Sequence, residues 1–82
     1  MSPHYIKRQQ ADTIYMDKQQ FGIRLGQIRQ SKEISAYELS LRIGRATNYI
    51  SSVERGKVNI SLESILNIAK ELEISPCEFF KK

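Results

Sequence analysis

Residues 35–56 read SAYELSLRIGRATNYISSVERG, and this stretch decides the fold. Its first half predicts a short helix, because Ser35 can accept a hydrogen bond as the N-cap and Glu38 can return one, as in a capping box. Leu39 and Ile43 then fall on one face of that helix at i, i+4 spacing. We therefore expect a helix whose apolar face packs on a neighbour.

A second short helix is expected after a turn at Gly44, where a left-handed residue ends a helix without a steric penalty. Gly56 ends the second helix in the same way. The apolar side of this helix carries, at i, i+4, i+7 spacing, Ala46, Ile50 and Val53. Its opposite side is polar and is formed by Thr47, Asn48, Ser51, Ser52 and Arg55. A helix this short needs tertiary packing, so we expect its apolar side on the first helix and its polar side facing outward.

The pattern resembles the helix-turn-helix of the phage repressor and Cro type, the xenobiotic-response-element (XRE) family of DNA-binding transcriptional regulators. The family's apolar positions, small residue and turn glycine fall on Leu39, Ile43, Ile50, Val53, Ser40 and Gly44. The resemblance covers residues 21–80, where FGIRLGQIR is similar to the family's first helix. It implies an all-α, five-helix, lambda-repressor-like domain, which we place at residues 17–82 behind an N-terminal arm or tail at residues 1–16.

The chain of 82 residues has room for one domain. One cysteine and one histidine exclude an internal disulfide and a zinc cluster, and we expect no cofactor or metal. The sequence has neither the ~20-residue apolar run of a membrane span nor a signal-peptide h-region, so we expect a cytoplasmic, nucleoid-associated protein. Residues 1–60 hold ten Lys and Arg against five Asp and Glu, whereas residues 61–82 hold three against four. The basic part contains the predicted helix-turn-helix, as expected of a surface that faces a polyanion, although an ordinary surface explains this excess as well.

Another helix is expected before the motif, over residues 18–31, opened by Asp17 and Gln20 as an N-cap pair. Its inward stripe has i, i+4, i+7 spacing and is formed by Phe21, Leu25 and Ile28. Gly22 and Gly26 weaken the helix, but their position on one side permits a neighbouring helix to approach closely.

After the motif, Ser61 is expected to cap a fourth helix with a wide inward stripe, formed by Leu62, Ile65, Leu66, Ile68, Ala69 and Leu72. Ser75 and Pro76 open a last short helix. We assign its Phe79 and Phe80 to the core, with an exposed dimer contact as the alternative.

By the resemblance, Arg29 pairs with Glu54 and ties the first helix to the end of the recognition helix. Two solvated charges are the alternative. Glu33 and Glu73 stand where the family prefers Gly or Asn after a helix, so we expect strained or differently shaped turns at both positions.

The resemblance places the polar side of the helix at about 46–55 in the major groove, where base edges present distinct donor and acceptor patterns. We expect base contacts from Thr47, Asn48, Ser51 and Ser52, among which the Asn48 amide suits adenine. We expect contacts to the DNA backbone from Tyr37, Arg45, Tyr49, Arg55, Lys57 and Asn59. A solvated helix face is the alternative for each of them.

Three residues depart from the family's pattern. Ala36 replaces a glutamine that helps to hold the phosphate backbone, a contact that Tyr37 can supply instead. Arg45 stands at a usually apolar turn position and can reach DNA. Ala46 replaces a hydroxyl cap, which leaves the start of the second helix less well satisfied.

We expect no enzyme, because the sequence has no carboxylate pair in a plausible cleft, no glycine-rich phosphate loop and no Ser/His/Asp set. The first hypothesis is a transcription regulator, a repressor that binds double-stranded DNA as a homodimer. The second is an antitoxin-like protein that also binds a partner toxin, and the third is a protein-interaction module without DNA binding. A dimer contact would come from the Phe79–Phe80 end or from residues 1–16, which are otherwise a frayed tail or a basic arm that binds DNA through Lys7 and Arg8.

Overall fold

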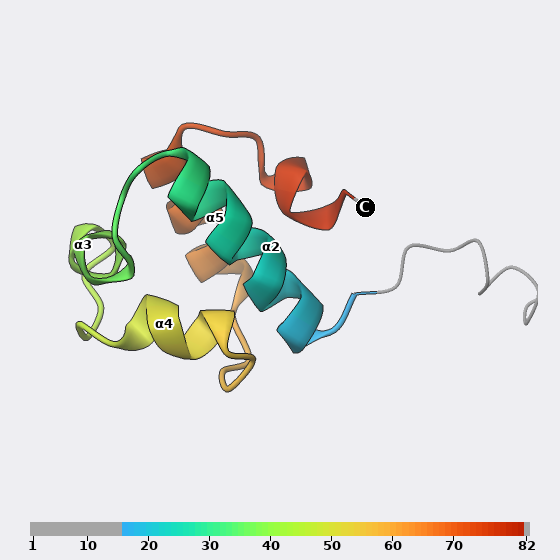
Figure 1. Ribbon diagram of the computed structural model, residues 1–82, viewed down its shortest axis with the longest axis horizontal. Coiled ribbons are helices and arrows are strands. Elements are labelled where there is room, and N and C mark those ends of the chain that lie inside the picture. Colours follow the sequence, from blue (N-terminus) through green and yellow to red (C-terminus); the bar gives the residue numbers. More distant parts are fainter. Residues whose placement is uncertain (1–15, 82) are drawn as a thin grey trace, which may run out of the picture.

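The computed structural model describes residues 16–81, in which all regular structure is helical. Four α-helices and a closing 3-10 helix follow one another: α2 (Lys18–Ser31), α3 (Ala36–Arg42), α4 (Tyr49–Glu54), α5 (Leu62–Leu72) and η1 (Pro76–Phe80). In Figure 1, α2 crosses the middle of the domain, α4 lies below it and α3 lies at one end. The all-α class is confirmed, although the last of the five expected helices is a 3-10 helix. The predictions for the N-terminal arm lie outside the described residues, except at Met16, which packs against the core.

Helix α2 begins and ends where the sequence predicts. The Asp17 carboxylate accepts from the Gln20 backbone N–H at 2.8 Å, and the Gln20 side chain accepts from the Asp17 N–H at 3.3 Å, which completes a capping box. The inward stripe of α2 is buried as predicted. At its C-terminal end, the Ile34 N–H donates to the Arg29 carbonyl. Glu33 lies between them with φ at 59°, so the helix ends through a left-handed residue that carries a side chain.

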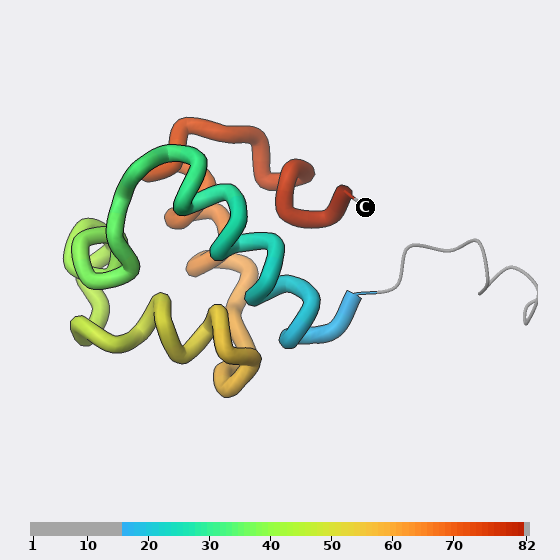
Figure 2. The backbone as a smooth tube through the Cα atoms, in the orientation of Figure 1, coloured from blue at the N-terminus to red at the C-terminus, as the bar shows by residue number. Residues whose placement is uncertain are grey.

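One hydrophobic core joins the five elements, and its buried side chains are Phe21, Leu25, Ile28, Leu39, Ile50, Val53, Ile68, Ala69, Leu72 and Phe79. Helix α2 packs on α4 and η1, while α3 packs on α4 and α5. The chain path in Figure 2 shows how η1, at the end of the sequence, returns beside α2. There the Phe79 ring lies 5.3 Å from the Phe21 ring. The assignment of Phe79 to the core is therefore correct, whereas Phe80 lies at the surface with 41% of its area exposed.

The predicted inward stripe of α5 is too wide. Ser61 caps the helix as expected, accepting from the Ser64 N–H. Leu62 and Leu66, however, are 69% and 48% exposed. The stripe that meets the core runs through Ser64, Ile68 and Leu72 at i, i+4, i+8 spacing. With 3.6 residues per turn, the two leucines fall to one side of that line.

Helix α4 is shorter than the predicted helix at about 46–55, because it begins at Tyr49. The Tyr49 N–H donates to the Ala46 carbonyl, and the first α-helical bond runs from the Ser52 N–H to the Asn48 carbonyl. Ala46 is exposed and precedes the helix, so the prediction that it lies on the apolar side of that helix is wrong. The Asn48 side chain, at the N-cap position, makes no capping hydrogen bond. Residues 45–48 lie outside the regular helices.

Gly22 sets the distance between α2 and α4. A Cβ atom at this position would lie 2.5 Å from the Val53 carbonyl oxygen and 2.6 Å from that of Glu54. Only glycine therefore allows the end of α4 to approach the backbone of α2 this closely. The close helix approach predicted from the glycine spacing is present at Gly22.

Candidate DNA-binding surface

A buried serine joins the two helices of the motif. Ser40 on α3 is fully buried, and its hydroxyl donates to the Ala36 carbonyl at 2.8 Å. The same hydroxyl accepts from the Ile50 backbone N–H at 3.0 Å. Because the first N–H groups of a helix have no partner within it, this bond supplies the acceptor that α4 lacks and sets the angle between the two helices.

The first helix of the motif begins at Ser35, whose hydroxyl accepts from the Glu38 N–H at 3.0 Å. The expected reciprocal bond from the capping box is wrong, because the Glu38 carboxylate accepts from Arg42 Nε at 3.0 Å instead. The helix ends at a left-handed Gly44, with φ at 73°, and the Arg45 N–H donates to the Ser40 carbonyl. This arrangement directs the chain away from α3 and into α4.

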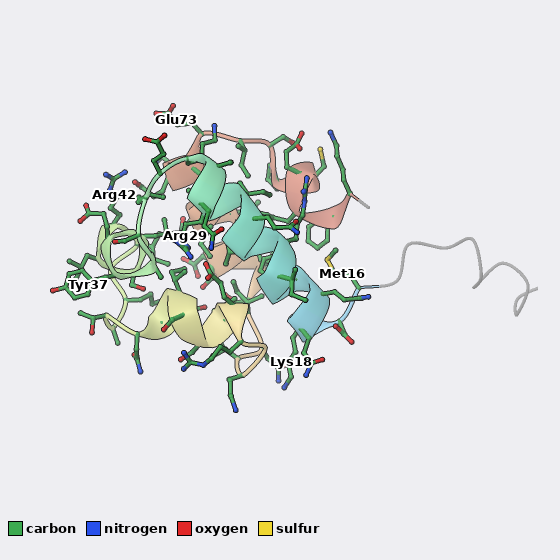
Figure 3. The ribbon with its side chains drawn as sticks, in the orientation of Figure 1. Met16, Lys18, Arg29, Tyr37, Arg42 and Glu73 are labelled. Atoms are coloured by element: carbon green, nitrogen blue, oxygen red, sulfur yellow. The ribbon has the colours of Figure 1, made fainter. Side chains whose placement is uncertain are left out.

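An ion pair with α2 holds the inner side of α4. Arg29 Nε lies 2.6 Å from Glu54 Oε2, and Arg29 Nη2 lies 3.1 Å from Glu54 Oε1. Arg29 Nη1 also donates to the Ile34 carbonyl at 2.9 Å. Figure 3 shows Arg29 pointing into the space between α2, α3 and α4. The hydrogen bond to Glu54 raises the pKa of Arg29 above its ordinary value, so this guanidinium stays charged.

The inner side of α4 is thus fully occupied, by Ile50 and Val53 in the core and by Glu54 in the ion pair. The four expected base-contacting residues lie on the other side. Thr47 and Asn48 are exposed in the turn before α4, and Ser51 and Ser52 are half-buried on its first turn. The Ser51 hydroxyl donates to the Asn48 carbonyl at 3.0 Å, whereas the Asn48 amide makes no capping bond.

The residues expected on the DNA backbone do not behave alike. Five are exposed around the motif, namely Tyr37, Arg45, Arg55, Lys57 and Asn59, and Figure 3 shows Tyr37 projecting outward from α3. Arg45 also contacts other side chains, since its Nη2 donates to Ser64 Oγ at 2.7 Å. Its guanidinium carbon also lies 4.6 Å from the centre of the half-buried Tyr49 ring.

The sequence analysis did not predict the role of two buried serines behind this surface. Ser40 counted only as a small residue, and Ser64 was part of no pattern, yet both are buried with hydroxyls that bind elements distant in sequence. A serine at a core-facing helical position is the signal that could have found them, because a buried hydroxyl needs a partner. Within residues 16–81, no group of His, Cys, Asp and Glu could hold a metal ion, and no helix could cross a membrane.

A model of the family described as helix-turn-helix matches residues 25–79. The chain belongs to this family. It is a DNA-binding transcriptional regulator of the phage-repressor type, and this membership agrees with the expectation of a non-enzymatic protein.

The chain is similar to known control and regulator proteins. Control protein C.BamHI from Bacillus amyloliquefaciens is 40% identical over 57 residues, which are 68% of this chain and 70% of the relative. The crystal structure of the restriction-modification controller protein C.AhdI from Aeromonas hydrophila is 41% identical with a TM-score of 0.75, and covers 80% of this chain and 100% of its own. The clp gene regulator ClgR from Corynebacterium glutamicum is 22% identical with a TM-score of 0.74, covering 82% of this chain and 71% of its own, and shows the same fold. These relatives give no support to the antitoxin hypothesis.

Proposed function

We propose that this chain is a homodimeric repressor that controls the genes of a restriction-modification system. The observation that carries the proposal is its likeness to C.AhdI over the whole length of that controller protein, at 41% identity. The likeness to the control protein C.BamHI supports the same assignment. The protein would act on chromosomal DNA, in the cytoplasm.

Bases would be read by the segment before α4 and by its first turn. Thr47 and Asn48 are exposed, and the Asn48 amide, which makes no capping bond, can donate to and accept from adenine in the major groove. Ser51 and Ser52 follow one turn later. Their hydroxyls bind either donors or acceptors and so discriminate less between bases.

The phosphate backbone would be held at both ends of the motif. Tyr37 stands at the start of α3, while Arg55, Lys57 and Asn59 follow the end of α4. Such contacts fix the register of the protein on the duplex but read no bases. Arg55 and Lys57 would make affinity depend on salt, because each neutralised phosphate releases counterions.

A second copy is required because α4, with six residues, can touch only a few base pairs. Two copies related by a two-fold axis would read a palindrome with their helices about 34 Å apart. The Phe79–Phe80 end offers little for this contact, because Phe79 is in the core. Leu62 and Leu66 on α5 offer more, since both are exposed on one side of the helix.

The charges beside these leucines suit two copies of α5 in antiparallel orientation. Glu63, Leu66 and Lys70 lie along one exposed side at i, i+3, i+7 spacing. A two-fold axis near Leu66 would place Glu63 of each copy against Lys70 of the other, as an isologous interface requires. Leu66→Glu should then raise the dimer dissociation constant by about 30-fold or more, measured by sedimentation equilibrium. Ile23→Glu, at an exposed position on α2, is the matched control and should leave it unchanged.

The proposal is tested by selecting bound fragments from genomic DNA with the purified protein. We expect a palindromic site, occupied by two copies, next to a restriction endonuclease or methyltransferase gene. Transcription from that promoter in vitro should fall when the protein is added. One copy bound to sites without symmetry would contradict the dimer, and sites remote from any restriction-modification gene would contradict the assignment.

A further inference from the structure

We propose that Arg45 is a positioning residue, which clamps the turn that carries Thr47 and Asn48 onto α5 instead of binding a phosphate. The inference rests on the proposed reading of DNA by this turn. It assigns a role to an arginine that stands where the family usually has an apolar residue.

The clamp is made of two contacts of one guanidinium. Its carbon lies 4.6 Å from the centre of the Tyr49 ring, within the range of a cation–π contact. Its Nη2 donates to Ser64 Oγ at 2.7 Å. Arg45 and Tyr49 flank residues 46–48, so their contact closes a short loop with Thr47 and Asn48 inside it.

The anchor of the clamp is rigid. Ser64 is 2% exposed, and its hydroxyl also accepts from the Ser61 hydroxyl at 3.1 Å. The Ser61 hydroxyl in turn accepts from the Ser64 N–H and caps α5. Arg45 therefore binds Ser64, which is itself bonded to the N-cap residue of α5. The charge of the guanidinium strengthens this hydrogen bond.

The segment needs such support because residues 45–48 lie outside the regular helices. A turn without helical hydrogen bonds would lose conformational freedom when it enters the groove, and that loss weakens binding. A turn that is already fixed before binding avoids much of this loss. Arg45 thus contributes to operator affinity by ordering Thr47 and Asn48, without touching the DNA.

A phosphate contact and a clamp differ in their salt dependence. Loss of a phosphate contact weakens binding to all sequences alike and reduces the slope of log affinity against log salt by about one. Loss of the clamp weakens operator binding alone and leaves that slope unchanged. For Arg45→Ala we expect affinity for the selected operator to fall about 10-fold, with affinity for random duplex and the salt slope as in the parent protein.

Ser64→Ala provides an independent test, because Ser64 is buried and removing its hydroxyl breaks the clamp without changing Arg45. This variant should show part of the same operator-specific loss, and the double variant should lose no more than Arg45→Ala alone, since both remove one interaction. Arg42→Ala, an exposed arginine three residues earlier, is the control and should leave the operator affinity unchanged. Thermal unfolding of each variant shows that the domain remains folded.

Amide NMR spectra of the free protein test the clamp without DNA. In both Arg45→Ala and Ser64→Ala, we expect the Thr47 and Asn48 signals to shift and their heteronuclear NOE values to fall. Unmoved signals would overturn the inference, as would an equal loss on operator and random duplex with a reduced salt slope. If the parent protein itself failed to prefer its selected site over random duplex, the proposed function would fail instead.

Discussion

Arg29 and Glu54 form a bidentate ion pair that joins the end of α4 to the last turn of α2. Their side chains are only 13% and 16% exposed, and the shorter N–O distance is 2.6 Å. Together with the Ser40–Ile50 hydrogen bond and the buried side chains of Ile50 and Val53, the pair holds the inner side of α4 in place. It therefore fixes the helix that presents the polar surface outward.

Glu54→Ala should lower the free energy of unfolding by about 2–3 kcal/mol, because it leaves a largely buried arginine without its partner. A double-mutant cycle with Arg29→Ala, followed by chemical denaturation, measures the coupling, which we expect at about 1–3 kcal/mol. The exposed pair Glu38–Arg42 is the matched control and should couple by less than about 1 kcal/mol. Equal coupling in the two pairs would show that burial gives Arg29–Glu54 no special weight.

Gly22→Ala should destabilise the domain by about 1–3 kcal/mol, because the added methyl group meets the carbonyl oxygens of Val53 and Glu54. Gly26→Ala is the comparison on the same helix. Its Cβ would meet only the Glu54 side chain, at 3.3 Å, and alanine has the higher helix propensity. The melting temperature of Gly22→Ala should therefore be well below that of Gly26→Ala. The opposite order would be incompatible with the close approach of α4.

Glu73→Gly should stabilise the domain by up to about 1 kcal/mol. Glu73 ends α5 with φ at 59°, a left-handed conformation that costs a residue with a side chain about 1–2 kcal/mol, and glycine's greater freedom in the unfolded chain offsets part of the gain. Glu71→Gly, two residues earlier inside α5, should destabilise by about 1 kcal/mol. Denaturant midpoints of both variants make the measurement, and a loss of stability for Glu73→Gly would show that the Glu73 side chain compensates for its backbone.

The sequence predicted those features that repeat along one helix or end it. The stripe of Phe21, Leu25 and Ile28 follows from spacing alone, and the left-handed Gly44 follows from its place after an apolar position. The pairing of Arg29 with Glu54 was expected only from the family resemblance, because 25 residues separate the two.

Features that depend on contacts between helices escaped prediction. Leu62 and Leu66 have the right spacing for a core stripe, yet the side of α5 that meets the core runs through Ser64, Ile68 and Leu72 and leaves them exposed. Arg45 is a cation in the motif, which on chemistry alone suits a phosphate. Its contacts with Tyr49 and Ser64 become visible only when the first turn of α5 is placed beside the motif.

The central claim is that the segment around Asn48 reads bases, and the most direct test is the binding of Asn48→Ala to the selected operator and to random duplex. We predict a loss of about 1–3 kcal/mol on the operator, a relaxed preference at one base pair, and little change on random duplex. An equal loss on both duplexes, with base preference unchanged at every position, would contradict the account and reassign Asn48 to the DNA backbone.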